Sequence, residues 1–119
     1  MAMSRVIEVA QKFSRTPGPR YKIHGDFSGE EFREKYLEDA LRAAIAQNSE
    51  LTVVLDDVAG YGSSFLEEAF GGLLRHGFTK AQVDKHLKIV ARTNRFRHHA
   101  ISAHEYIEEE AARSQAIAH

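Results

Sequence analysis

A run of five uncharged residues, LTVVL (51–55), is followed at once by Asp56 and Asp57 and constrains the fold more than any other segment. A half-buried strand alternates apolar and polar residues, whereas a strand covered on both faces is apolar throughout. The run therefore predicts a central strand over 51–56, with helices packed on its sheet. Buried strands of this kind are typical of α/β proteins.

Three further segments predict strands beside this one. Residues 5–10 (RVIEVA) are short and β-branched, and residues 88–92 (KIVAR) are similar. Residues 20–25 (RYKIHG) alternate in the way that a half-buried or edge strand does. Together with 51–56 they predict a mixed sheet of about four strands.

Amphipathic segments between the strands predict about four helices packed on this sheet. Ser28 and Glu31 have the spacing of a capping box, and apolar residues then recur on one helical face over 29–47. The other helices are expected at 64–76, after Thr79 and from about Asn94. In the last helix Phe96, Ala100, Ile101, His104 and Ile107 are expected to face the core.

Length and charge exclude several classes of protein. The chain has 119 residues, which fits one domain of about 100–150 residues. It has no cysteine, so disulfides and thiolate metal sites are excluded. Its net charge of −1 argues against a dedicated nucleic-acid-binding protein. No signal peptide or membrane-spanning segment is recognised, so we expect a cytoplasmic protein that has no membrane partner.

The segment GYGSSFLEEAFGG (60–72) joins the central strand to the helix expected at 64–76. Ser64 and Glu67 have the spacing of a capping box, which predicts Ser64 as the N-cap of that helix. Two catalytic motifs do not fit this turn. A nucleophile elbow needs glycine on both sides of the serine, but Leu66 occupies the second position. A Walker A loop needs a lysine, and none lies between Val58 and Lys80.

The strand ending in aspartate, the glycine turn, the serine pair and the apolar helix together resemble STAS domains, typified by bacterial anti-sigma-factor antagonists. The block GSSFLEEAFGGL with the upstream SGEEFREKYL is more closely similar to a STAS-like family of unknown function found in bacteria and archaea. The resemblance covers about residues 5–107. It implies a single STAS-like α/β domain over 1–119, whose C-terminal helical end is expected to fray.

The resemblance also implies a function. In STAS antagonists a serine at the start of this helix is phosphorylated by a partner ATPase-type kinase, and phosphorylation releases the domain. By position this implies Ser64 as the phosphorylated residue, with Ser63 as its neighbour. The implied partner is a histidine-kinase-like ATPase or an anti-sigma-type kinase. The residues expected to bind it are Gly60, Tyr61, Gly62, Ser63, Ser64, Phe65, Glu67 and Glu68.

The residues leave two other functions open. The glycine turn and the helix N-terminus are compatible with a small-ligand or anion-binding domain. A hydrolase with Ser64 as nucleophile is the least favoured hypothesis, so we expect no enzymatic activity. No cofactor or metal is predicted, because the seven histidines lack the H-E-x-x-H spacing of a zinc site.

Three further features have a structural interpretation. Asp56 and Asp57 are expected to form a turn after the strand, and Gly71 and Gly72 to allow close packing of another backbone. A small basic cluster at 92–99 could contact nucleic acid or an acidic partner surface, but a solvated face is the favoured interpretation.

Overall fold

A computed structural model describes residues 4–118 of the protein, with side chains as far as Ser114. Strands β1 (Arg5–Glu8), β2 (Leu51–Val54) and β3 (Leu87–Val90) form a parallel sheet in the order β1-β2-β3. Ile7 lies opposite Val53, which lies opposite Ile89. The prediction that residues 51–56 form the central strand is therefore confirmed.

The predicted mixed sheet of four strands is wrong, because residues 20–25 form no strand. Lys22–His24 instead form a short 3₁₀ helix (η1). The amides of Gly29 and Glu30 donate hydrogen bonds to the carbonyls of Pro19 and Arg20, and the Glu30 carboxylate accepts one from the Lys22 amide. The backbone groups of this segment are thus used by the start of the following helix, which leaves them unable to pair with a strand.

Two long helical segments follow β1 and β2, as predicted for residues 29–47 and 64–76. Each contains a short π-helical stretch. After the single turn α1 (Val9–Lys12), the first segment comprises α2 (Gly29–Phe32), η2 (Arg33–Leu37) and α3 (Glu38–Ala46). The second comprises α4 (Ser63–Leu66), η3 (Glu67–Gly71) and α5 (Gly72–Arg75), and is followed by α6 (Lys80–His86). The last helix is α7 (Asn94–Ala118).

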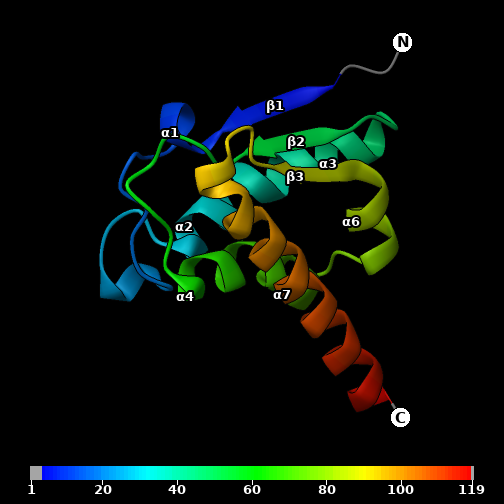
Figure 1. The fold of residues 1–119 in the computed structure, drawn as a ribbon. Coiled ribbons are helices and arrows are strands. Elements are labelled where there is room, and N and C mark those ends of the chain that lie inside the picture. Colours follow the sequence, from blue (N-terminus) through cyan, green and yellow to red (C-terminus); the bar gives the residue numbers. More distant parts are fainter. Residues whose placement is uncertain (1–3, 119) are drawn as a thin grey trace.

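The helices cover mainly one face of the sheet (Figure 1). Both crossovers move in the same direction along the sheet, and right-handed crossovers in one direction lie on one face. On that face Ile7, Val53 and Ile89 are buried. On the other face Val6 is 53% exposed and Lys88 is also exposed. In the central strand, by contrast, Val54 on this second face is 2% exposed and Thr52 is partly buried, so the exposed residues of that face lie in the flanking strands β1 and β3.

A buried ion pair joins the two crossovers. Arg33 of η2 is 1% exposed and Glu68 of η3 is 4% exposed, and the guanidinium of Arg33 donates to both the carboxylate and the carbonyl oxygen of Glu68. The Nε of Arg33 also donates to Glu38 over 2.9 Å. Because a buried charge is costly without such partners, these contacts fix how the two helical segments pack.

The network extends from Glu68 to the last helix and to the loop before α2. Arg75 of α5 contacts Glu68 over 3.3 Å and also contacts Glu67 and Glu110. Arg20 of the loop forms an ion pair with Glu67. Four separate parts of the chain therefore meet around one set of charges.

Gly71 and Gly72 provide the space that this network needs. A Cβ on Gly72 would lie 2.7 Å from Nη1 of Arg33. A Cβ on Gly71 would lie 2.7 Å from the carboxylate of Glu67 and 3.4 Å from the carbonyl oxygen of Tyr106 in α7. The predicted close approach is confirmed at Gly71 by a backbone atom, whereas at Gly72 the neighbour is a side chain.

The buried face of α7 differs from the predicted one. Ile101 is 54% exposed and His104 is exposed, so neither belongs to the core. The buried face instead follows Phe96, Ala100, Ala103 and Ile107, and Glu110 continues this spacing and pairs with Arg75. The helix extends to Ala118. The residues that α7 buries are Phe96, Ala100, Ala103, Ile107 and Glu110.

We predict that Glu68→Gln lowers the free energy of unfolding by about 3 kcal/mol. The variant leaves the buried guanidinium of Arg33 charged but removes one of the carboxylates that balance its charge. Urea denaturation monitored by circular dichroism measures this. The control is Glu50→Gln, which removes an exposed ion pair with Lys88 and should change the stability by less than about 1 kcal/mol. Equal losses in the two variants would contradict the structural role of the network.

Candidate functional site

Asp56 holds the end of β2 against the start of α7. Its carboxylate accepts hydrogen bonds from the amides of Arg92 (2.8 Å) and Thr93 (2.9 Å) and from the Thr93 hydroxyl (2.7 Å). Burial acts to raise the pKa of Asp56, but these hydrogen bonds outweigh it, so the pKa lies below its usual value. Asp57 is exposed and has a positive φ of 71°, as in a turn. The two carboxylates therefore have different roles, and the role of Asp56 is to hold the end of β2 to the segment that precedes α7.

Tyr61 fixes the path of the glycine turn. Its hydroxyl donates a 2.8 Å hydrogen bond to the carbonyl oxygen of Leu55, and its ring lies 5.6 Å from that of Phe65. Burial, aided by the Asp56 carboxylate, raises the pKa of Tyr61. The Tyr61 ring also lies 5.1 Å from the ring of His99 in α7. Burial and the neighbouring His98 both lower the pKa of His99. The turn is therefore packed against α7.

The helix begins one residue earlier than predicted, so Ser64 is not its N-cap. Gly62 is the N-cap, its carbonyl oxygen accepts from the Leu66 amide, and no side chain caps the helix. The expected capping box fails because the Glu67 carboxylate is bound by Arg20 and Arg75. Among the side chains described, residues 4–114, neither the Ser63 nor the Ser64 hydroxyl forms a hydrogen bond.

The eight residues expected to bind a partner divide into two groups. Phe65 and Glu68 are buried, and Glu67 is largely enclosed by its arginines. Burial acts to raise the pKa of Glu67, but hydrogen bonds from Arg75 and Arg20 lower it below its usual value. The residues that reach the surface are Gly60, Tyr61, Gly62, Ser63 and Ser64, of which Gly62 and Ser63 are the most exposed.

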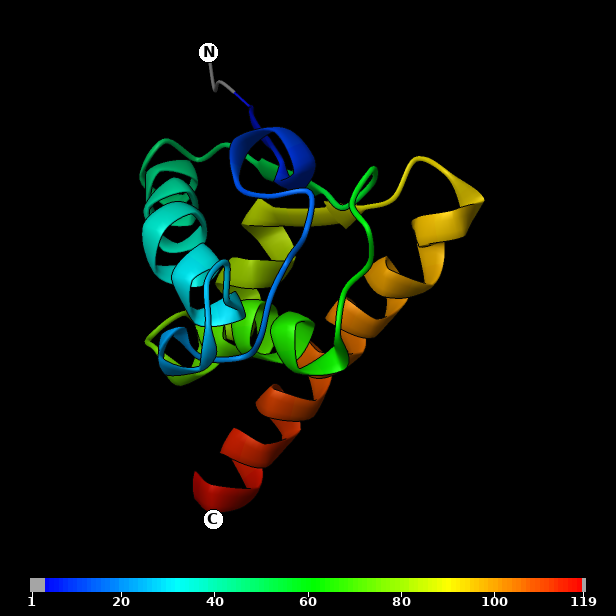
Figure 2. The same ribbon diagram turned by 90° about the vertical axis from the view of Figure 1, so that its left-hand side faces the viewer.

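The loop between α1 and α2, whose residues 20–25 were expected to form a strand, runs beside this turn in its first part (Figure 2). The carbonyl oxygen of Arg15 accepts a 2.7 Å hydrogen bond from the Ala59 amide. Phe13 connects the two segments through its ring, 5.6 Å from Phe27 and 6.2 Å from Phe65. The loop presents three exposed apolar side chains, whose exposed fractions are 40% for Tyr21, 88% for Ile23 and 41% for Phe27.

We call the residues Gly60–Ser64 together with Tyr21, Ile23 and Phe27 the turn surface. Exposed apolar side chains that gather in one place mark interaction sites more often than isolated ones do. In the sequence, the only sign of these exposed residues is that Tyr21 and Ile23 alternate with basic residues, a pattern that is also typical of an edge strand. Without the fold, this pattern could not be distinguished from an edge strand.

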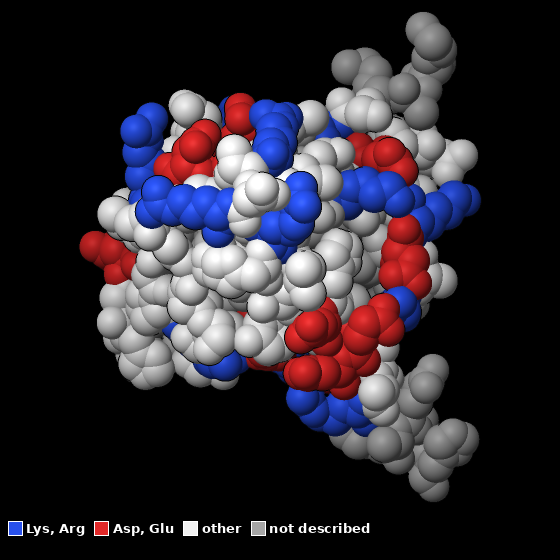
Figure 3. All heavy atoms as spheres, viewed as in Figure 1, with Lys and Arg blue, Asp and Glu red and all other residues white. Residues whose placement is uncertain are grey.

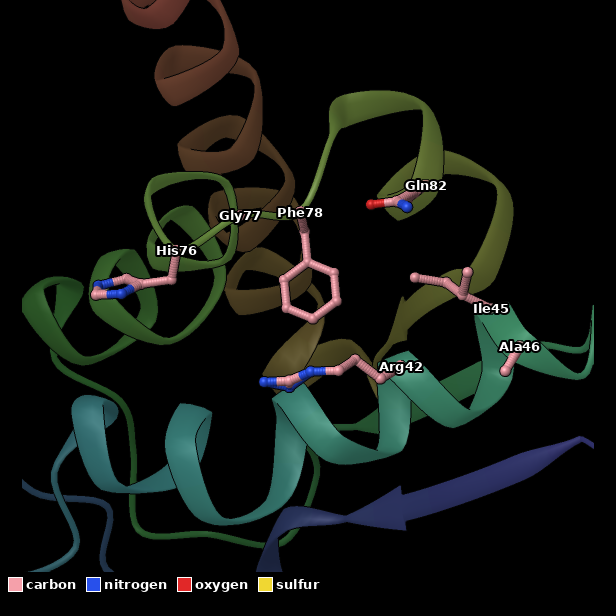
Figure 4. A pocket seen from close by; sticks show the side chains of 7 residues that line it. All are labelled: Arg42, Ile45, Ala46, His76, Gly77, Phe78 and Gln82. Carbon is pink, nitrogen blue, oxygen red and sulfur yellow. The ribbon is translucent and has the colours of Figure 1, made fainter.

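A cavity of about 400 Å³ lies at the opposite end of the sheet (Figure 4). It is formed by α3, by the turn after α5 and by α6, with Arg42, Phe78 and Gln82 in its wall. The guanidinium of Arg42 lies 5.5 Å from the centre of the Phe78 ring. None of the predicted site residues lines this cavity, so it does not support a small-ligand site at the glycine turn.

No cluster of residues suited to a metal ion occurs in the described part of the chain. The basic cluster at 92–99 lies at the start of α7, with Arg92, Arg95, Arg97 and His98 exposed. Likewise, no helix within residues 4–118 is both long enough and apolar enough to cross a bilayer.

Comparison with known families identifies the chain. The model of a family described as "STAS-like domain of unknown function (DUF4325)" matches residues 28–94, more than half of the sequence. The chain belongs to this family. The matched part of this STAS-like domain runs from the N-cap of α2 to the first residue of α7 and contains the serine turn. No curated protein and no solved structure matches the sequence.

We predict that Asp56→Asn destabilises the STAS-like domain by about 2 kcal/mol at neutral pH, because hydrogen bonds to a charged acceptor are lost. The pKa of Asp56 is lowered in the folded state, so its contribution is complete above the unfolded pKa of about 3.9 and disappears as the pH falls through the folded value. Urea midpoints of wild type and variant should therefore converge in acid.

Asp57→Asn is the matched control for this experiment, because Asp57 is adjacent and exposed. Asparagine tolerates the positive φ at this position, so we expect a change below about 0.5 kcal/mol. A difference between wild type and Asp56→Asn that stayed constant from neutral to acid pH would contradict the role of the Asp56 carboxylate.

Proposed function

We propose that this STAS-like domain is a regulatory protein–protein interaction module whose partner docks on the turn surface. Phosphorylation of the serine pair by a partner ATPase-type kinase then releases it. The proposal is supported by two serines with unbonded hydroxyls at the start of a helix whose Phe65 is linked, through the ring of Phe13, to the loop that carries three exposed apolar side chains. An apolar patch provides binding energy, and a modifiable group at its edge provides control of that energy.

The folded domain can accept a phosphate at this position. Ser63 and Ser64 are the first two residues of a helical segment, where free amides and the helix dipole favour a negative charge. Glu67 and Glu68 lie close in sequence and would repel a phosphate if they were free. Their ion pairs with Arg20, Arg33 and Arg75 offset this repulsion.

The same phosphate opposes the binding of a partner. It adds about −1.5 to −2 charges at neutral pH. Residues 58–66 carry neither acidic nor basic side chains, so the phosphate would add charge to a segment that has none of its own. Burying it against apolar side chains such as Ile23 is costly, which favours release of the partner.

The resemblance to anti-sigma-factor antagonists supports the class of partner. Those proteins bind histidine-kinase-like ATPases or anti-sigma-type kinases through the matching turn and helix. For this chain we propose a kinase of that class. The family itself is described as being of unknown function, and the proposal supplies a specific role that can be tested.

We predict that Ser64→Glu weakens binding to the isolated ATPase by at least about tenfold, or about 1.4 kcal/mol. The ATPase is first identified by affinity capture on the immobilised wild-type domain and then purified. Isothermal titration calorimetry compares the variants with wild type. Ser64→Ala should leave binding intact and change the stability by less than about 0.5 kcal/mol, because Ser64 does not cap the helix.

Ser114→Glu is the control, since it adds the same charge at an exposed position on α7. Ser63→Glu tests which hydroxyl of the pair controls binding. If Ser64→Glu and Ser63→Glu both bound the ATPase with wild-type affinity, the switch would be refuted. A domain that captured no ATPase, and whose capture of other proteins was unaffected by Ile23→Asp, would refute the docking surface.

A further inference from the structure

Helix α7 leaves one of its faces without a covering element. It is the longest helix described, and its second half projects away from the rest of the molecule in both ribbon views (Figures 1 and 2). Ile101 lies on the uncovered face and is 54% exposed. Arg97 and Glu105, four residues before and after it, lie on the same side and are also exposed.

Charge is segregated along this helix. Within α7, residues 94–103 contain two arginines and no carboxylate, whereas residues 104–112 contain four glutamates and no lysine or arginine. The surface view shows the same separation, with basic side chains over the start of α7 and acidic side chains over its middle (Figure 3). Ile101 lies close to the boundary between the two zones.

The stability of α7 does not explain this pattern. Basic residues at a helix N-terminus are unfavourable because the helix dipole is positive there. The first turn of α7 contains no acidic residue. Within residues 4–114, Arg95 and Arg97 form no ion pair, and neither do Glu105 and Glu109. These four exposed charges are therefore available to an external partner, whereas the exposed Glu108 and Arg113 already pair with Lys80 and Glu110.

The pattern is complementary to itself. In two antiparallel helices related by a twofold axis at Ile101, Arg97 of one copy lies opposite Glu105 of the other, and the reverse pair forms by symmetry. The two Ile101 side chains then meet at the axis. Antiparallel packing also brings the basic start of each α7 to the acidic middle of its partner.

We infer that a second copy of this chain docks on the uncovered face of α7, in an antiparallel arrangement about Ile101. The contact contains one large apolar residue from each copy and is otherwise charged. It is therefore a reversible homodimer whose association weakens as salt screens the ion pairs. This inference does not depend on the proposed function, because the turn surface is separate from the face of α7 that carries Ile101.

Sedimentation equilibrium of the full chain at low ionic strength tests the inference. We expect a monomer–dimer equilibrium for wild type. Arg97→Glu and Glu105→Arg should each raise the dissociation constant by more than about tenfold, because each places like charges opposite one another twice. Lys12→Glu, a charge reversal at an exposed position on α1, should leave the dissociation constant unchanged.

Mixing the two variants gives the decisive result. One chain then carries two glutamates and the other two arginines at positions 97 and 105, so both ion pairs form again in a heterodimer. An equimolar mixture should regain dimer, and so should the double variant Arg97→Glu/Glu105→Arg. A wild-type chain that stays monomeric at every concentration would overturn the inference. So would single variants that dimerise normally, or a mixture that remains monomeric.

Discussion

The ion pair between Arg33 and Glu68 is the contact on which the rest of the structure depends. It joins the helical segment before β2 to the one after it, and both side chains are almost completely buried. A buried charge is costly unless a partner of opposite charge lies beside it, so removing either residue leaves the other unpaired. Gly72 provides the space for this pair, because a Cβ there would lie too close to the Arg33 side chain. From Glu68 the network reaches α7 through Arg75 and Glu110. One set of charges therefore joins both crossover segments and α7.

This arrangement shapes the turn surface. Because Glu67 and Glu68 point toward arginines, the helix that starts at Ser63 presents no free carboxylate near its first turn. Asp56 is used in the same way, since its carboxylate is occupied by the backbone of Arg92 and Thr93. What remains within residues 58–66 is uncharged, although the exposed Asp57 and Lys22 flank the turn surface. A phosphate on either serine would add about −1.5 to −2 charges to this uncharged segment.

The sequence predicted the structure correctly wherever the local pattern of residues agrees with their burial in the fold. The apolar run at 51–55 identified the central strand, the amphipathic patterns identified both crossover helices, and the block around the serines identified the family. It failed where a distant residue decides the outcome. The Glu67 carboxylate, which the pattern assigned to a capping box with Ser64, is bound by Arg20 and Arg75. Residues 20–25 alternate like a strand, yet their backbone bonds to the start of α2. The buried face of α7 includes Glu110, which pairs with Arg75 of a distant helix.

The central claim is that the buried network holds the serine turn in place, and amide hydrogen exchange in Glu68→Gln tests it most directly. The relevant amides are those of Leu66, which bonds to Gly62 at the helix start, and of Ala59, which bonds to Arg15. The Leu55 amide, bonded to Val90 in the sheet, serves as the reference for global unfolding. We expect exchange at Leu66 and Ala59 to become at least about tenfold faster in the variant under conditions where Leu55 remains protected. Unchanged exchange at both amides would show that the turn keeps its structure without the network, and would contradict the account.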